Sequence, residues 1–350
     1  MGKVVVDTKY LLGYAKQLDG LAEEADQKFQ GYISKHYANI DGMDGWLSNA
    51  RGAVENIADT AKNLNYHTAT GLIATSASLC GAANSYDSAD KEAARQLFQT
   101  AATLMPEDYE ERDVRARSSD TFPRGLEVDL PTPKPVHKAP PYRKRLHKDL
   151  DDVSPWIEQV TGYDVLQRAL SLARPEWGSL DRIGEAYRHG SDWYYAIADN
   201  MRTGMNILSS HWTDGAASAA FDYFIRERWM KHLETRAVAE RMMGEDFEYV
   251  CAGVDAVMEF LAGIIQTLAD FARKMRWAMD DMSAEDYWEA AKDFVKAVWA
   301  FHKIVKTLGR SLGDLGHLIE LFIDLVFDEA HTGVNMVSGY DRVPTLNDTE

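Results

Sequence analysis

The sequence is short of cysteine and of positive charge. Its 350 residues include two cysteines, Cys80 and Cys251, which lie in separate apolar stretches without metal-ligand spacing, so neither a disulfide framework nor a zinc site is indicated. The 38 Lys and Arg residues are outnumbered by 55 Asp and Glu residues, which gives a formal net charge of −17. This charge argues against a nucleic-acid or anionic-membrane binder, because either would need a cationic face. We interpret the acidity as a source of solubility.

Long hydrophobic runs are also missing. No stretch reaches the about 18 uninterrupted apolar residues that suggest a membrane-spanning helix. Residues 250–272 and 312–327 come nearest, but acidic residues interrupt both of them. The apolar run near the N-terminus is too short for a secretory signal peptide and is followed by Asp7 and Lys9. If the protein leaves the cell, we expect it to do so without an ordinary cleaved signal.

Motifs with a catalytic or metal-binding mechanism are not found. The letters FDEAH at 327–331 resemble a helicase motif, but no phosphate-binding glycine loop accompanies them. The chain has no HExxH zinc motif, no Glu-x-x-His di-iron pattern and no nucleophile elbow. His211 could titrate near neutral pH, but we interpret it as an exposed histidine in a turn. The sequence thus predicts a protein that is not an enzyme and needs no cofactor or metal.

Proline is rare outside one region, and this divides the chain. Seven of the ten prolines lie between Pro106 and Pro141, where proline removes backbone donors and forces its neighbours to be extended. We expect residues 106–150 to form an extended, partly mobile linker. It separates an N-terminal region, 1–105, from a second region, 151–282. A further segment, 283–328, and a polar tail, 329–350, follow.

The first two regions carry apolar residues at alternating steps of four and three, which is the spacing of one face of a helix. In the first region, two glycines and two aspartates at 39–45 predict a turn between two long helices. In the second, one helix is expected over about 180–208 and another from Ala216 toward Met279, with a break near Gly244. The predicted buried faces are Leu11, Ala15, Leu18, Ala22, Ala25 and Phe29; Ala50, Ala53, Ile57, Ala61 and Leu64; Leu72, Thr75, Leu79 and Ala82; and Leu180, Ile183, Tyr187, Tyr194, Ile197, Met201, Met205 and Leu208.

This pattern predicts an all-α fold. No alternating run of β-branched residues indicates a strand. We expect an elongated antiparallel four-helix bundle made of two long helical hairpins, because apolar steps of four and three favour shallow helix crossing. The segment 283–328 is expected to add a C-terminal amphipathic helix that starts at Ser283.

Two short motifs stand at the predicted helix ends. Tyr86 and Asp90 lie four residues apart near the end of the first hairpin, so they share one helix face. Trp212 follows the predicted helix over 180–208, and Asp214 can cap the next helix. The small residues at 216–220 let two helices approach closely beside the indole. The tryptophan is then either a plug over the end of the bundle or a handle for another chain.

Taken together, these motifs resemble those of the type VII (ESX) secretion substrates of actinobacteria. The layout is similar to the secreted EspB-like family, itself similar to a fused PE–PPE pair, and the first hairpin also resembles small EspC-like proteins. The resemblance assigns Tyr86 and Asp90 to a Y-x-x-x-D secretion signal. It assigns Trp212 to a W-x-G-like tip in which Asp214 takes the glycine position and Gly215 follows one residue later.

The resemblance implies a non-enzymatic protein that is exported folded and acts as a secreted helical effector or structural component. The tyrosine motif and the tryptophan tip would meet at one end of the bundle as a composite export signal. A type VII secretion ATPase would bind this signal, with a WXG-type or chaperone protein as a further partner and a homo-oligomeric ring as an assembled form. The protein would be cytoplasmic before export and secreted or at the cell surface afterwards.

Two alternatives stay open from the sequence. A membrane-active, pore-forming helical protein is suggested by the apolar segments 250–272 and 312–327, and opposed by their acidic residues and by the net charge. Dye release from liposomes would favour this alternative. The other is the delivery module of a toxin that lacks its catalytic domain.

Overall fold

The fold is all-α, as predicted, in a computed structural model of the chain. Helix makes up 88% of the part that the structure describes. The described residues are 5–43, 45–87, 121–123, 125–126, 128–135, 154–161, 178–213, 216–278, 292–293, 295–301, 303–304 and 306–307.

The N-terminal region is a pair of antiparallel helices. The first is continuous through α1 (Thr8–Glu23), the π-helical turn η1 (Glu24–Phe29) and α2 (Gln30–His36). It starts at Asp7, whose carboxylate accepts a hydrogen bond from the Lys9 backbone N–H at 3.1 Å. After a turn at 37–43, the 3-10 helix η2 (Gly45–Ala50) leads into α3 (Arg51–Asp87). Every apolar position predicted to be buried in this hairpin is buried.

The second region is another antiparallel pair. It consists of α8 (Gly178–His211), β2 (Trp212–Thr213), α9 (Ala216–Tyr223), the π-helical turn η3 (Phe224–Trp229) and α10 (Met230–Ala278). The predicted break near Gly244 is wrong, because α10 passes through it without interruption. Gly244 instead lies where α10 meets α8: a Cβ added there would lie 2.8 Å from the Gly184 carbonyl oxygen. The missing side chain therefore allows two backbones to approach, which sequence cannot distinguish from a helix break.

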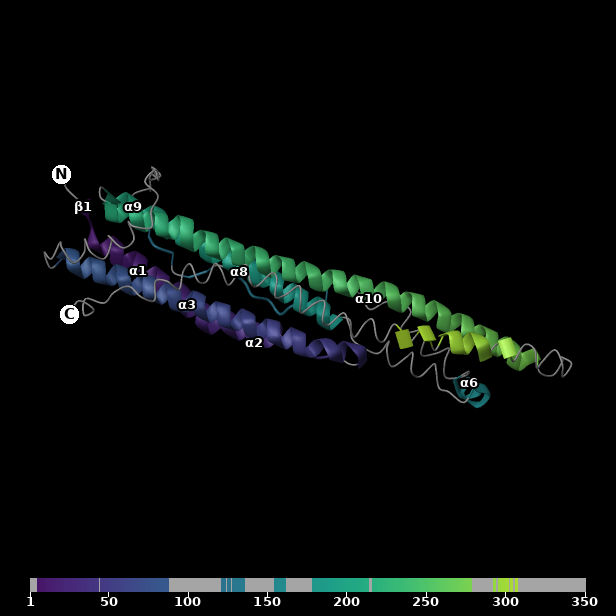
Figure 1. Cartoon of the computed structure of the whole chain (residues 1–350). Coiled ribbons are helices and arrows are strands. Elements are labelled where there is room, and N and C mark those ends of the chain that lie inside the picture. The colour runs from purple at the N-terminus through teal and green to yellow at the C-terminus, as the bar shows by residue number, and fades with distance from the viewer. Residues whose placement is uncertain are drawn as a thin grey trace, which may run out of the picture.

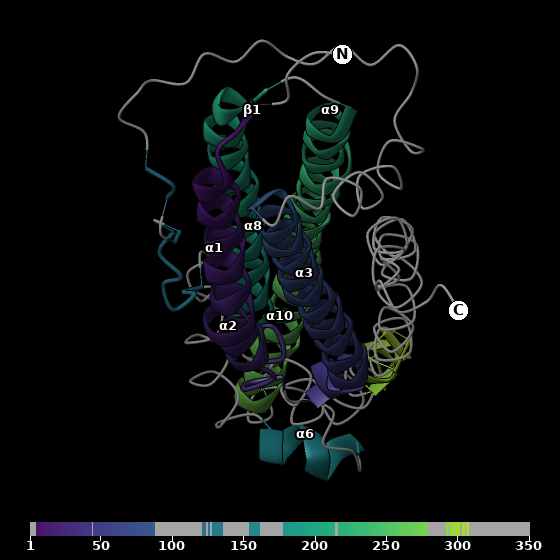
Figure 2. The ribbon, with the colours of Figure 1, turned by 90° about the vertical axis from the view of Figure 1, so that its left-hand side faces the viewer.

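The two hairpins pack side by side around one apolar core (Figure 1, Figure 2). Polar contacts connect the helices: the Tyr14 hydroxyl of α1 donates to the Met201 carbonyl oxygen of α8 at 3.0 Å, and the Trp229 indole of η3 donates to the Thr75 hydroxyl of α3 at 3.2 Å. Figure 1 shows that α10 extends past the ends of the other long helices. In Figure 1 the helical residues between 292 and 307 lie at the level of this extension, as does α6 (Ser154–Thr161), and Figure 2 shows them to one side of α10.

Two very short strands were not expected from the sequence. The strand β1 (Val5–Val6) pairs with β2 in antiparallel fashion, with Val5 opposite Thr213 and Val6 opposite Trp212. Neither strand has enough residues to show an alternating pattern. Their pairing ties the start of the first hairpin to the connection between α8 and α9.

A proline-rich part of the expected linker, residues 121–123, 125–126 and 128–135, is bound to the bundle; we call it the strap. It contains no helix or strand, as its prolines predict. The Phe122 ring fills a notch above Gly13, where an added Cβ would lie 2.5 Å from the ring. Gly125 has a φ of 119°, which favours glycine, and its carbonyl oxygen accepts a hydrogen bond from Asn200 at 2.9 Å. The Leu126 backbone N–H donates to both oxygens of Glu24 at 3.3 Å. The strap therefore packs against α1 and α8 rather than standing away from them.

Within the described ranges, none of the helices has the length and apolar character to cross a membrane. The segment 312–327 lies outside these ranges. The same ranges hold no group of three or more His, Cys, Asp or Glu placed to bind a metal.

Candidate functional site

The candidate site is the end of the bundle at which α3 and α8 end and α1 and α9 begin (Figure 1, Figure 2). We call it the tip. It gathers segments that are far apart in the sequence: β1 at the N-terminus, Tyr86 at the end of α3, and Trp212 between α8 and α9. The tip therefore exists only when both hairpins are folded and docked.

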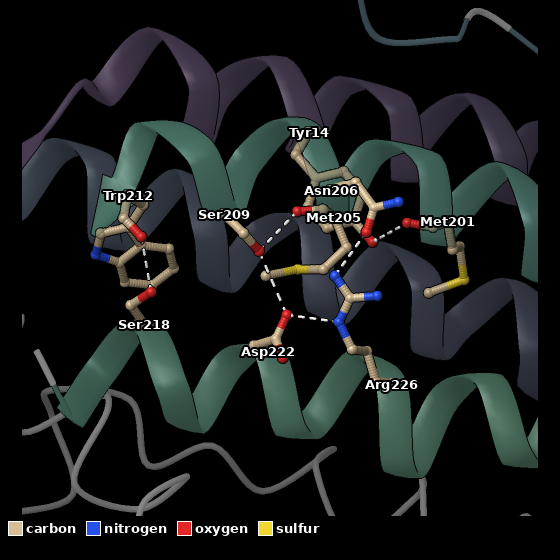
Figure 3. A network of polar contacts seen from close by, with 9 residues as sticks. All are labelled: Tyr14, Met201, Met205, Asn206, Ser209, Trp212, Ser218, Asp222 and Arg226. Carbon is tan, nitrogen blue, oxygen red and sulfur yellow. Dashed lines mark hydrogen bonds and ion pairs between the residues drawn. The ribbon is translucent and has the colours of Figure 1, made fainter. Parts of the chain in front are cut away.

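Trp212 is a plug in the tip rather than an exposed handle. Its side chain is 1% exposed, and its ring lies 5.8 Å from that of Phe221 in α9. The Ser218 hydroxyl donates a hydrogen bond to the Trp212 carbonyl oxygen at 2.8 Å, as Figure 3 shows. Ser218 and Ala220 are themselves buried, which agrees with the expectation that small residues leave room beside the indole.

Tyr86 lies directly against this plug. It is partly buried and packs against the same apolar core. Burial raises the pKa of Tyr86, while the neighbouring Trp212 side chain lowers it. Tyr86 and Trp212 thus meet at one end of the molecule, as the family resemblance implies.

Backbone pairing and ring stacking complete the outer surface of the tip. The Asp7 backbone N–H donates to the His211 carbonyl oxygen at 3.3 Å, next to the paired strands. The His211 ring stacks on Tyr10 with a centroid distance of 3.5 Å and an interplanar angle of 13°. His211 is therefore half-buried against α1, whereas the sequence suggested an exposed turn. Thr213 is exposed beside it.

A buried ion pair between Arg226 and Asp222 lies next to Trp212 in the bundle. The Arg226 Nε donates to Asp222 at 2.7 Å, and its Nη2 donates to the Asn206 side chain at 2.7 Å (Figure 3). Ser209 of α8 adds a hydrogen bond to the same Asp222 carboxylate at 3.3 Å. These contacts fix α9 and η3 against α8 just behind Trp212. The spacing of Asp222 and Arg226, four residues apart, is the sequence signal that could have revealed the pair.

The remaining predicted site residues are not placed. Asp90 lies outside the described residues, as do Asp214 and Gly215. Of the five residues assigned from the sequence, the structure thus brings together Tyr86 and Trp212.

A second polar cluster, the central network, lies in the middle of the bundle and was not expected. Glu240 of α10 accepts hydrogen bonds from the Tyr37 hydroxyl at 2.8 Å and from Arg236 at 3.1 Å. Arg236 also donates to the Tyr194 hydroxyl of α8 at 3.3 Å. Burial raises the pKa of Glu240 to about 7, although Arg236 and the bond from Tyr37 lower it. Burial beside Arg236 lowers the pKa of His232 to about 3. The cluster connects both hairpins in a site closed to solvent, so we interpret it as structural.

No family model, curated protein or solved structure matches this chain.

Proposed function

We propose that this protein is a non-enzymatic substrate of a type VII secretion system, exported folded and active outside the cell as a helical effector or structural component. In this proposal its two hairpins form a PE–PPE-like bundle. Tyr86 and Asp90 form the export motif, and the tip around Trp212, including Asp214 and Gly215, completes it. The secretion ATPase binds this composite surface. A WXG-type or chaperone partner and a homo-oligomeric ring belong to the same proposal.

The contact between Tyr86 and Trp212 is the observation that supports the proposal. A signal made from both hairpins reports that the chain is folded, because unfolding separates its parts. Trp212 is buried, so its part in such a signal is to position Tyr86 and the outer residues of the tip. The surface available to a partner is then formed by Tyr86, Thr213 and the stacked pair of Tyr10 and His211.

Export from the native host tests the proposal. We expect Tyr86→Ala to fold normally but to stay inside the cell, since the motif loses its ring. Tyr66→Ala is the matched control, because Tyr66 is also on α3 and is 56% exposed at a distance from the tip. Each variant is measured by its amount in culture medium relative to cells, with circular dichroism and a thermal melt as the test of folding. Normal export of a folded Tyr86→Ala protein would contradict the proposed signal.

A conservative substitution at Trp212 distinguishes a role in positioning Tyr86 from a role in folding. Trp212→Phe keeps an apolar plug but has a smaller ring beside Tyr86, so we expect a folded bundle with a displaced Tyr86 side chain. Reduced export of this variant at unchanged melting temperature would support a positioning role for the indole. Full export would restrict the signal to Tyr86 and its neighbours.

A further inference from the structure

The strongest unexplained surface lies on the helical segment between 292 and 307, far from the tip. Four lysines and one tryptophan there follow each other at steps of four, three, four and three: Lys292, Lys296, Trp299, Lys303 and Lys306. Residues with this spacing lie along one face of a helix. All five side chains are exposed, and Trp299 is 44% exposed. We call this face the lysine stripe.

The opposite face of the same segment is buried. Val298 and Phe301 are 3% and 2% exposed and belong to the core that includes Ile265 and Ala269 of α10. Figure 1 shows the segment at the level of the part of α10 that extends past the other long helices. The lysine stripe therefore points away from the bundle, on a part of the molecule that projects beyond the other long helices.

Residues 292–307 carry a charge opposite in sign to that of the whole chain. The acidic residue within 292–307 is Asp293, which pairs with Lys296 at 2.8 Å. The four lysines extend over about 21 Å of helix, at 1.5 Å per residue. In the sequence, Glu285 and Glu289 stand seven and three residues before Lys292, so acidic residues border the stripe at that end. At physiological ionic strength the charges of more distant parts of the protein are screened beyond about 8 Å. The net charge of −17 thus hides a cationic face.

We propose that the lysine stripe docks on an anionic phospholipid surface. Lysines reach the headgroup phosphates with their flexible side chains, and a tryptophan among them sits at the level of the headgroups, where indoles are favoured. The apolar face of the segment stays buried in the core, so this is contact along the membrane surface without insertion of the helix. The docking is independent of the export proposal, since it uses the other end of the molecule.

Vesicle binding tests the docking surface with the full chain. The probes are vesicles of phosphatidylcholine alone and of phosphatidylcholine mixed with phosphatidylglycerol, with bound protein measured by co-sedimentation. We expect binding to the anionic vesicles that weakens as salt rises. Each lysine near such a surface contributes about a fivefold gain in affinity, so Lys296→Gln with Lys303→Gln should weaken binding about 25-fold.

The matched control removes two exposed lysines from the bundle. Lys16→Gln with Lys35→Gln changes the net charge equally but leaves the stripe intact, so it should bind as the unchanged protein does. These exposed substitutions should leave the thermal melt unaltered. The proposal is overturned if anionic vesicles are not bound, if neutral vesicles bind equally, or if the control pair loses as much affinity as the stripe pair.

Discussion

Removing the Glu240 carboxylate should destabilise the bundle strongly, because the side chain of its partner Arg236 cannot become neutral. The side chains of Glu240 and Arg236 are 0% and 1% exposed, and the carboxylate also accepts the Tyr37 hydroxyl. Arginine stays protonated at any ordinary pH. Glu240→Leu therefore leaves a buried positive charge, for which the expected loss in unfolding free energy is about 3–5 kcal/mol.

The reverse substitution should depend on pH. In Arg236→Met the carboxyl at position 240 can take up a proton and become neutral, and burial already raises its pKa to about 7. We therefore expect this variant to recover stability at pH 5 relative to pH 8, while Glu240→Leu does not. In the double variant both charges are gone, and replacing a whole buried pair by apolar residues is often nearly neutral. The Tyr37 hydroxyl still loses its acceptor there, which costs about 1–3 kcal/mol.

Chemical unfolding followed by circular dichroism measures these differences at the two pH values. Glu227→Leu is the matched control, since Glu227 pairs with Lys231 at the same spacing but at the surface, where such a pair contributes about 1 kcal/mol or less. If the double variant is less stable than Glu240→Leu, or if the two single losses simply add, the reasoning about an uncompensated charge is refuted.

Three further predictions concern stability. His232→Gln should make the free energy of unfolding fall as pH rises from about 4.5 to 7. The raised pKa of Glu240 stabilises the folded state at low pH, and this stabilisation is lost as pH rises toward 7. The lowered pKa of His232 acts in the opposite direction, because its stabilisation is present above pH 6.5 and is lost as pH falls toward 3. A denaturation series against pH checks it, and an unchanged slope would contradict it. Gly190→Ala should destabilise the protein by about 1–3 kcal/mol, because its Cβ would overlap the Tyr37 hydroxyl. Gly20→Ala has nothing within 4 Å of the added Cβ and should stabilise the helix slightly. Equal melting temperatures of the two variants would contradict the predicted overlap. Phe122→Ala should expose the strap to protease at an otherwise similar melting temperature, and unchanged cleavage would show that the ring does not hold it.

Local periodicity was enough to predict which helix faces are buried. The apolar positions of both hairpins recur at steps that follow from helix geometry, and that signal lies within a few residues of each position. The same is true of the turn at 39–45, where short-range side-chain and backbone chemistry decides. The meeting of Tyr86 and Trp212 was expected from the family resemblance, since helix ends by themselves do not say which ends of two hairpins dock together.

The tertiary structure decided what depends on partners distant in sequence. Strands of two residues have no pattern, so the pairing of β1 with β2 arises from the place where the folded hairpins bring them. A glycine such as Gly244 can either break a helix or allow another backbone to approach, and the sequence does not distinguish these. The close approach of Gly184 in the folded protein shows that the second applies. Glu240 and Arg236 look like an ordinary surface pair until four helices enclose them. Helix periodicity is a property of one segment, whereas burial of charge and close approach are properties of several segments together, so the sequence alone determined the elements and the packing determined their chemistry.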